Sequence, residues 1–123
     1  MKILAIEDEL NMQKLIEYNL RHFGYEALMA SNGRHGVDLA RKESPDLIFL
    51  DMMLPEMDGM ETLRALKENP VTRPIPVIML TARGQRSDVE QALAEGAAAY
   101  ITKPFDPATL KQMVERFASA KSE

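Results

Sequence analysis

Short apolar runs recur along the chain, separated by stretches that are long enough to form a helix. The runs are rich in Ile, Leu, Val and Ala and have the length of single strands: Lys2–Ile6, Tyr25–Ala30, Pro45–Leu50, Ile75–Leu80 and Ala98–Thr102. Most of them are apolar almost throughout, which is typical of a parallel sheet that is covered on both faces. We expect Tyr25–Ala30 to be an edge strand.

The stretches between these runs place their apolar residues at helical spacing. Ile16, Leu20 and Phe23 share one stripe, and the last stretch carries Leu110, Met113, Val114 and Phe117. Asp106-Pro107 is typical of a helix start, with an N-cap followed by proline at the first helical position. Five strands alternating with five helices predict an α/β fold: a doubly wound, five-stranded parallel sheet in the flavodoxin-like order 2-1-3-4-5.

Composition indicates one globular domain that covers residues 1–123. Apolar residues make up 46% of the chain and charged residues 28%. No apolar run reaches the roughly 18 to 20 residues that span a bilayer, and Met1 leads directly into a strand, so we expect a cytoplasmic protein without membrane contact. A net charge of −4 disfavours direct binding of nucleic acid, which depends on Lys and Arg.

Polar residues follow four of the predicted strands at their carboxyl ends, where open α/β sheets bind ligands. In chain order they are Glu7-Asp8-Glu9, Asp51, Thr81 and Thr102-Lys103. The first and third strands are neighbours in the predicted order, about 4.8 Å apart, so Glu7, Asp8 and Asp51 should lie close together. Carboxylates this close should raise at least one pKa unless a divalent cation compensates their charge.

This cluster favours a hard cation. The chain has no cysteine, and His22 and His35 are far apart, which disfavours a zinc site. Carboxylate ligands alone favour Mg²⁺ or Mn²⁺. A plainer interpretation is also open: Glu7-Asp8-Glu9 is a solvated loop in which Asp8 or Glu9 caps the next helix, and Lys103 is a surface charge.

Motifs at matching spacing cover nearly the whole chain and lie in Ile3–Glu9, Asp46–Pro55, Met57–Glu61, Pro76–Ala82 and Gly96–Phe105. Together they resemble the CheY-like receiver domains of response regulators in two-component signal transduction. The resemblance implies a Mg²⁺-dependent switch that accepts a phosphoryl group. It also implies a cis peptide bond between Lys103 and Pro104.

The resemblance assigns a role to each candidate residue. Asp51 would be the phosphoacceptor. Glu7 and Asp8 would hold the metal together with Asp51 and the backbone carbonyl of Met53. The hydroxyl of Thr81, the amide of Ala82 and the ammonium of Lys103 would contact the phosphoryl oxygens.

Expected partners also follow from the resemblance. The phosphoryl donor would be a phosphohistidine on a sensor histidine kinase or histidine phosphotransfer protein, and a downstream effector protein would read the result. We expect a monomer or weak dimer that is a signalling domain and not an enzyme, apart from hydrolysing its own aspartyl phosphate. A stand-alone regulator or phosphorelay intermediate is favoured; an excised receiver of a longer transcriptional regulator and a phosphorylation-independent binding module are the alternatives.

Some positions depart from the commonest pattern of the family. Glu7 stands where Asp is more frequent, and its extra methylene allows it to reach a metal through water. Met53 stands where the family helps to place the hydrolytic water, which leaves the lifetime of the phosphoryl group open. Aspartyl-phosphate phosphatases carry a second Asp at this position, so Met53 disfavours that enzyme class. Ala97-Ala98-Ala99 lacks acids typical of dimerising receivers.

A switch is implied around Thr81 and Tyr100. A phosphoryl group on Asp51 would attract the Thr81 hydroxyl and open space that the Tyr100 ring can enter. Strand alternation places Tyr100 and Lys103 on opposite sides, so the ring can face the predicted helix Gln85–Glu95. The alternative is that Tyr100 is simply a half-buried strand aromatic.

Overall fold

The computed structural model describes residues 1–82 and 86–122. Within these ranges it contains five strands, β1 (Lys2–Ile6), β2 (Glu26–Ala30), β3 (Leu47–Asp51), β4 (Val77–Ala82) and β5 (Ala99–Lys103). The five helices there are α1 (Leu10–His22), α2 (Gly33–Glu43), α3 (Gly59–Glu68), α4 (Arg86–Ala94) and α5 (Pro107–Ser122). The predicted helix Gln85–Glu95 is α4 in its described part, and Gln85 lies outside the described residues.

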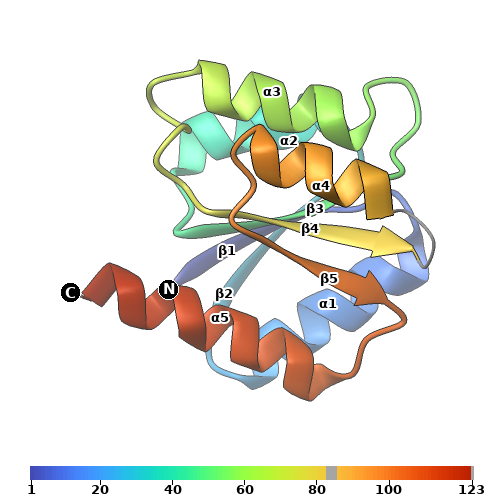
Figure 1. Ribbon diagram of the computed structural model, residues 1–123. Helices are drawn as coiled ribbons and strands as arrows, with labels where there is room; N and C mark the ends of the chain where they lie inside the picture. The colour runs from blue at the N-terminus through green and yellow to red at the C-terminus, as the bar shows by residue number, and fades with distance from the viewer. Residues whose placement is uncertain (83–85, 123) are drawn as a thin grey trace.

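All five strands of the described chain pair in parallel, in the order β2-β1-β3-β4-β5. The predicted strand order is confirmed, and β2 is an edge strand as expected. Helices α2, α3 and α4 cover one face of the sheet, and α1 and α5 cover the other (Figure 1). This is the doubly wound α/β fold.

Each face of the sheet has its own core, because successive strand residues point to opposite sides. Leu4 and Ile6 of β1 lie in the core under α2, α3 and α4, which also contains Leu63 and Leu66. Ile3 and Ala5 lie in the core under α1 and α5, together with Ile16, Leu20, Leu110 and Val114. The near-continuous apolar runs of the sequence therefore reflect burial on both faces.

Strand β5 lies one residue later than the sequence indicates, and β3 and β4 begin two residues later and also end later. Strand β3 begins at Leu47, because Asp46 instead forms hydrogen bonds with the backbone of Lys2. Strand β4 begins at Val77, because the amide of Ile75 donates to the Thr72 carbonyl in a turn. Both strands extend past their apolar runs, so Asp51, Thr81 and Ala82 still pair with neighbouring strands. These three candidate residues therefore belong to the sheet itself.

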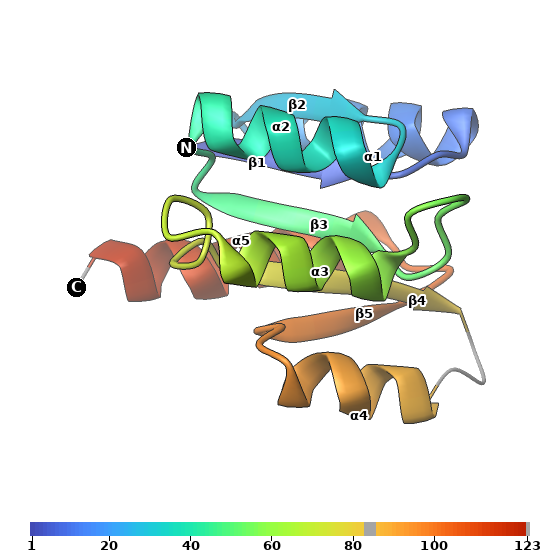
Figure 2. The same cartoon turned by 90° about the horizontal axis from the view of Figure 1, so that it is seen from above.

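The two edges of the sheet differ in what they carry. The carboxyl ends of all five described strands point to one edge, which we call the carboxyl edge. Met1 and the end of α5 both lie near the opposite, amino edge (Figures 1 and 2). Within residues 1–82 and 86–122, none of the helices has the length and apolar character needed to cross a membrane.

Candidate functional site

The register of the central strands brings the candidate residues together at the carboxyl edge. Ile6 of β1 pairs with Leu50 of β3, so the residues that follow them, Glu7 and Asp51, are adjacent. Asp51 pairs with Leu80 of β4. Ala82 pairs with Lys103 of β5, which aligns the fifth strand end with the others. Parallel pairing thus gathers residues that are up to 96 positions apart in sequence.

Three carboxylates form the centre of the site, as predicted. Ligand oxygens of Glu7, Asp8 and Asp51 all lie within 4.8 Å of one another. Glu7 is fully buried and Asp51 is 4% exposed, whereas Asp8 is exposed. Because water reaches the cluster from only one side, the charges of the two buried acids must be compensated within the protein.

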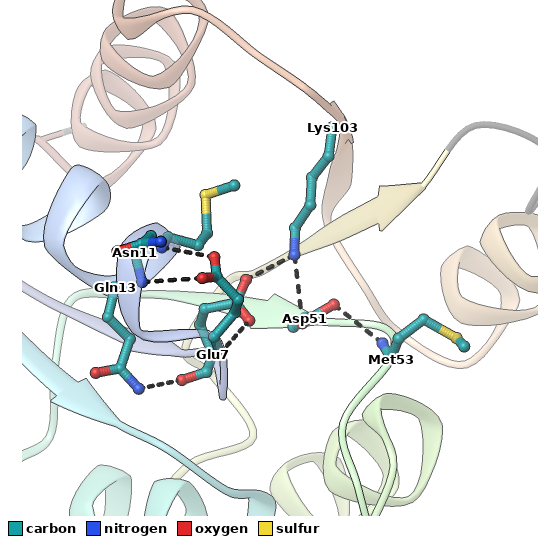
Figure 3. Close-up of polar contacts among 8 residues, drawn as sticks. Glu7, Asn11, Gln13, Asp51, Met53 and Lys103 are labelled. Atoms are coloured by element: carbon teal, nitrogen blue, oxygen red, sulfur yellow. Dashed lines mark hydrogen bonds and ion pairs between the residues drawn. The ribbon is translucent and has the colours of Figure 1, made fainter.

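Lys103 supplies that compensation. Its Nζ lies 2.6 Å from Oε1 of Glu7 and 3.3 Å from Oδ2 of Asp51 (Figure 3). The Lys103 side chain is 22% exposed, so the ammonium is largely removed from water. The surface-charge interpretation of Lys103 is therefore wrong. The peptide bond between Lys103 and Pro104 is cis, as the resemblance implied.

The local backbone fixes the Glu7 carboxylate in this position. Its Oε2 accepts a hydrogen bond from the Glu9 amide at 3.1 Å, while Oε1 contacts Lys103. The Glu7 amide donates to the Ala30 carbonyl at 2.9 Å. Gln13 donates its side-chain amide to the Glu7 carbonyl at 2.5 Å (Figure 3). Sequence analysis missed Gln13, because nothing in a helical glutamine signals that it reaches back to a strand end.

Glu9 has a different function from its two acidic neighbours. Its side chain accepts hydrogen bonds from the amides of Asn11 and Met12 and forms the N-cap of α1. The capping alternative considered for Asp8 or Glu9 is thus correct for Glu9. Capping leaves Glu7 and Asp8 as the acids of this loop that face Asp51.

Electrostatics within the cluster agree with the predicted crowding. Burial raises the pKa of Glu7, the Asp51 carboxylate raises it further, and Lys103 opposes the rise. For Lys103, burial alone would lower the pKa, but the hydrogen bond to Glu7 and the charges of Asp51 and Glu7 raise it above its ordinary value. Lys103 is therefore a cation throughout the neutral range.

The residues present fit a hard divalent cation. The donor set is composed only of oxygens, and the ligand oxygens are close enough to share one ion. Asp51 is held by the Met53 amide, which donates to its Oδ1 at 3.0 Å. The Met53 side chain is 65% exposed and extends away from Asp51 (Figure 3). Met53 as a ligand through its carbonyl stays a prediction.

Helix α3 packs its first turn directly on the Asp51 strand. A Cβ on Gly59 would lie 2.6 Å from the Asp51 carbonyl oxygen and 2.6 Å from Met52 Cα, so only glycine fits. The Gly59 amide donates to the Met52 carbonyl at 3.2 Å. A capping box between Asp58 and Glu61 starts the helix. These contacts fix α3 relative to the phosphoacceptor position.

Thr81 and Tyr100, the two residues of the switch hypothesis, point to the same face of the sheet, because Tyr100 pairs with Met79 and Thr102 pairs with Thr81. Thr81 is 2% exposed and pairs with Thr102 of β5. Tyr100 is 45% exposed, which agrees with the alternative of a half-buried strand aromatic, and its part in a switch stays a prediction. Its ring borders a cavity of about 450 Å³ between α4, β5 and α5, lined by Leu93, Ala98, Ala99, Tyr100, Met113 and Arg116.

Comparison with known proteins identifies the family. The response regulator receiver domain matches residues 3–115. The alkaline phosphatase synthesis transcriptional regulatory protein PhoP of Bacillus subtilis is 40% identical over 93% of this chain and 47% of its own length. The phosphate regulon transcriptional regulatory protein PhoB of Pseudomonas aeruginosa is 44% identical over 98% of this chain and 55% of its own length. The chain thus spans about half the length of these relatives.

Solved structures agree with the sequence relatives. A response regulator of Chloroflexus aurantiacus superimposes with a TM-score of 0.90 at 30% identity, covering 96% of this chain and 97% of that one. The receiver domain of a sensor histidine kinase from Pseudomonas aeruginosa, with a magnesium ion coordinated in its active-site cleft, gives 0.87 at 34% identity, covering 94% and 95%. On the family match, the strand order and the acidic cluster with its lysine, the chain belongs to the response regulator receiver domain family, a family of signalling domains.

Proposed function

We propose that the receiver domain, residues 1–123, accepts a phosphoryl group on Asp51 with the help of Mg²⁺ or Mn²⁺. The donor is a phosphohistidine of a sensor histidine kinase or histidine phosphotransfer protein, and a downstream effector reads the change. The observation that carries this proposal is the Lys103 ammonium, which lies 2.6 Å from Glu7 and 3.3 Å from Asp51 at the end of β3. A cation beside a buried carboxylate suits phosphoryl transfer, in which negative charge must be offset.

In the proposed step, an oxygen of the ionised Asp51 carboxylate attacks phosphorus in line with the donor nitrogen. The new O–P bond forms as the P–N bond breaks, and the electron pair of that bond remains on the imidazole, which takes a proton from solvent. No general base is required, because the nucleophile is a carboxylate and not a hydroxyl that must lose a proton. Lys103 moves from sharing two carboxylates to contacting the bound phosphoryl oxygens.

Two further groups would donate to those oxygens. Thr81 and Ala82 end strand β4 beside Asp51 and Lys103 in the sheet register, which supports their roles as hydroxyl and amide donors. Charge-assisted hydrogen bonds of this kind are stronger than neutral ones. Donors that are aligned before the reaction stabilise the transferring group without reorganisation.

Asp8, Asp51, Glu7 and the Met53 carbonyl are the groups that would hold the ion. When bound, a divalent cation neutralises the carboxylates and the incoming phosphoryl oxygens. In the described arrangement both Glu7 carboxylate oxygens already have partners, Lys103 and the Glu9 amide. Asp8 and Asp51 are therefore the better candidates for direct ligands, and Glu7 for one that acts through water.

Loss of the phosphoryl group would reset the switch by attack of water on the aspartyl phosphate. The Met53 thioether offers no strong hydrogen-bond acceptor to orient that water. Its side chain is also 65% exposed and lies away from Asp51 (Figure 3). We propose that this domain hydrolyses its own aspartyl phosphate without help from a side chain at position 53 that accepts a hydrogen bond from the attacking water.

The output would be carried by Thr81 and Tyr100. Rotation of the Thr81 hydroxyl toward the phosphoryl group would allow the exposed Tyr100 ring to turn inward. This change would remodel the surface formed by α4, β5 and α5, where the cavity beside Tyr100 lies. Beryllofluoride, a phosphate analogue, should then shift the NMR signals of Ala82, Tyr100 and α4, and an unchanged Tyr100 ring would contradict the mechanism.

A receiver within a longer regulator is the second candidate. It is favoured by the length of the relatives PhoP and PhoB, which are named transcriptional regulatory proteins and are about twice as long as this chain. In that case the effector would be a domain of the same polypeptide. A phosphorylation-independent binding module is disfavoured, because Asp51, Thr81 and Lys103 are all present.

Intact-mass measurement after incubation with acetyl phosphate and Mg²⁺ tests the phosphoacceptor directly. We expect the wild type and the control Asp38→Asn, at an exposed position of α2, to gain one phosphoryl mass. Asp51→Asn should gain none. A phosphorylated Asp51→Asn protein, or a wild type that stays unmodified, would show that the proposal is wrong.

A further inference from the structure

The C-terminal end of α4 is joined to α3 by an ion pair outside the acidic site. Arg64 of α3 donates from Nε and Nη2 to the two carboxylate oxygens of Glu95, at 2.6 and 3.1 Å. A two-point pair of this kind fixes direction as well as distance. Gln91 donates to the same carboxylate at 3.0 Å. The hydrogen bond from Arg64 lowers the pKa of Glu95, so the pair is intact at neutral pH.

The backbone at this end of α4 is equally well defined. The Ala97 amide donates to the Ala92 carbonyl at 2.9 Å, and the Gly96 amide donates to the Leu93 carbonyl at 3.2 Å. With Gly96 at φ +113°, this is a Schellman termination. A Cβ on Gly96 would lie 3.3 Å from Cγ of Lys67, so a second side chain of α3 packs against this turn.

The N-terminal end of α4 has weaker contacts. Arg86 pairs with Glu90 of the same helix at 3.5 Å, and their side chains are 92% and 69% exposed. Among the described residues of α4, only Val89 and Ala92 are buried. This end also follows Ala82 closely in sequence, so it is the end nearest to the donors of the proposed phosphoryl site. Because few apolar side chains of α4 are buried, packing does little to fix the angle of this helix against the sheet.

Helix α3 provides a fixed base for the paired end. Its first turn contacts the Asp51 strand so closely at Gly59 that no side chain fits between them. Leu63 and Leu66 of the same helix are fully buried in the core. Packing of this density resists displacement. One end of α4 is therefore paired with a helix that is closely packed on β3 and the core, and the other end follows the strand that ends at Thr81 and Ala82 in the sequence.

We propose that the Arg64–Glu95 pair is the pivot of α4. When Asp51 changes state, the N-terminal end of α4 moves and the end at Glu95 stays on α3, so the helix rotates about this pair instead of sliding. The pair is thus a positioning device that decides which part of the α4, β5 and α5 surface changes. Its trigger rests on the function proposed above, whereas the attachment itself is a property of the free protein.

Hydrogen exchange of the whole domain, followed by mass spectrometry, tests the pivot with and without beryllofluoride and Mg²⁺. Arg64→Met removes the donors and retains an unbranched side chain. Arg41→Met is the matched control, because Arg41 pairs with Asp38 within α2 and is also exposed. The double variant Arg64→Glu, Glu95→Arg restores an ion pair with reversed charges.

In the free protein we expect Arg64→Met to accelerate exchange at Leu93–Ala97 by roughly two- to fivefold, the range that exposed ion pairs contribute. Arg41→Met should leave this segment unchanged, and the double variant should recover protection. In the wild type, beryllofluoride should alter exchange at Arg86–Glu90 more than at Leu93–Ala97. In Arg64→Met, beryllofluoride should alter hydrogen exchange at Arg86–Glu90 and at Leu93–Ala97 alike.

Several results would overturn the pivot. One is unchanged exchange at Leu93–Ala97 in Arg64→Met, and another is acceleration throughout the sheet, which would make the pair a general stability contact. Equal effects of beryllofluoride at both ends of wild-type α4 would also exclude it. If the analogue leaves Met52 and Met53 unaffected, the phosphoacceptor proposal fails, and the pivot is then judged by the free-protein variants alone.

Discussion

Two partly buried lysines, at opposite edges of the sheet, show how the same side chain acquires different properties. At the carboxyl edge, Lys103 contacts the carboxylates of Glu7 and Asp51. Near the amino edge, Lys67 of α3 donates to the carbonyls of Arg73 and Ile75, both at 3.0 Å. The pKa of Lys103 is raised above its ordinary value, and burial lowers the pKa of Lys67.

The difference arises from the acceptors and not from the burial. Both ammonium groups lose water, which disfavours their charged form. Two carboxylates more than compensate this loss for Lys103, whereas the dipoles of two carbonyls do not for Lys67. A lysine among acids can be released when another cation or a phosphoryl group arrives. A lysine that donates to backbone carbonyls, as Lys67 does, has no competing cation or phosphoryl group to replace its contacts. Its role is to stabilise the fold.

The largest expected difference between the two lysines is in phosphorylation. Lys103→Met should lower the initial rate of modification by acetyl phosphate and Mg²⁺ by about 100-fold, the effect of removing one preorganised charge-stabilising donor. Lys67→Met, the same substitution at the amino edge, should stay within about twofold of wild type. Time courses of intact mass measure both rates, and similar rates for the two variants would remove the functional distinction.

A smaller difference should appear in the stability of the metal-free protein. Lys103→Met leaves Glu7 buried without a cation, so we expect a loss of about 1–3 kcal/mol near pH 7.5. The pKa of Glu7 is already raised, and it rises further without Lys103. Stability of this variant should therefore recover as the pH falls and Glu7 becomes protonated.

Urea unfolding at several pH values, with and without Mg²⁺, measures this effect. Added Mg²⁺ should restore part of the loss, because a divalent cation compensates the same carboxylates. A deficit that is the same at pH 5.5 and pH 7.5 would mean that Glu7 is not the group left uncompensated.

Lys67→Met should also reduce stability, by about 1–2 kcal/mol, because the carbonyls of Arg73 and Ile75 lose their donor. This substitution leaves no buried carboxylate without a compensating cation, because the acceptors of Lys67 are backbone carbonyls. The loss should therefore be constant between pH 5.5 and pH 7.5 and insensitive to Mg²⁺ in the same unfolding experiments. A marked effect of Mg²⁺ on this variant would contradict the comparison.

The smallest expected effect is that the stability contributions of the two lysines change in opposite directions at alkaline pH. Lys103 has a raised pKa, so its contribution is complete below the ordinary value of 10.5 and is lost as the pH rises through the folded-state pKa. Lys67 has a lowered pKa, so the cost of its buried charge is complete below that pKa and is relieved as the pH rises toward 10.5. Unfolding of wild type and each Lys→Met variant between pH 8.5 and pH 11 should give opposite slopes.

Much of the carboxyl edge was predictable from sequence, because it depends on a few local rules. Strand β1 has the predicted bounds, Lys2–Ile6, since a continuous apolar run ends there in an acid. Parallel strands end at a common edge, so Glu7 and Asp51 had to converge once the strand order was known. Asp106 caps α5 with its side chain on the Thr109 amide, as the Asp-Pro pair indicated.

The contacts of the two lysines could not be predicted in the same way. Lys103 reaches Glu7 rather than solvent because β5 has a particular register and Glu7 is fixed by Glu9, neither of which leaves a pattern in the sequence. The acceptors of Lys67 are backbone carbonyls, which every residue carries. Side-chain contacts between elements that are distant in sequence depend on packing, and hydrophobic periodicity reports only which face is buried.

The position of the chain ends at the amino edge has a practical consequence for experiments in cells. A fluorescent protein or affinity tag joined through a short linker at Met1, or after α5, would leave the domain on the side away from Asp51 (Figures 1 and 2). The donor protein would then approach the acidic cluster without passing the fusion partner. Reporter fusions at either terminus should therefore preserve the phosphorylation kinetics of the isolated domain.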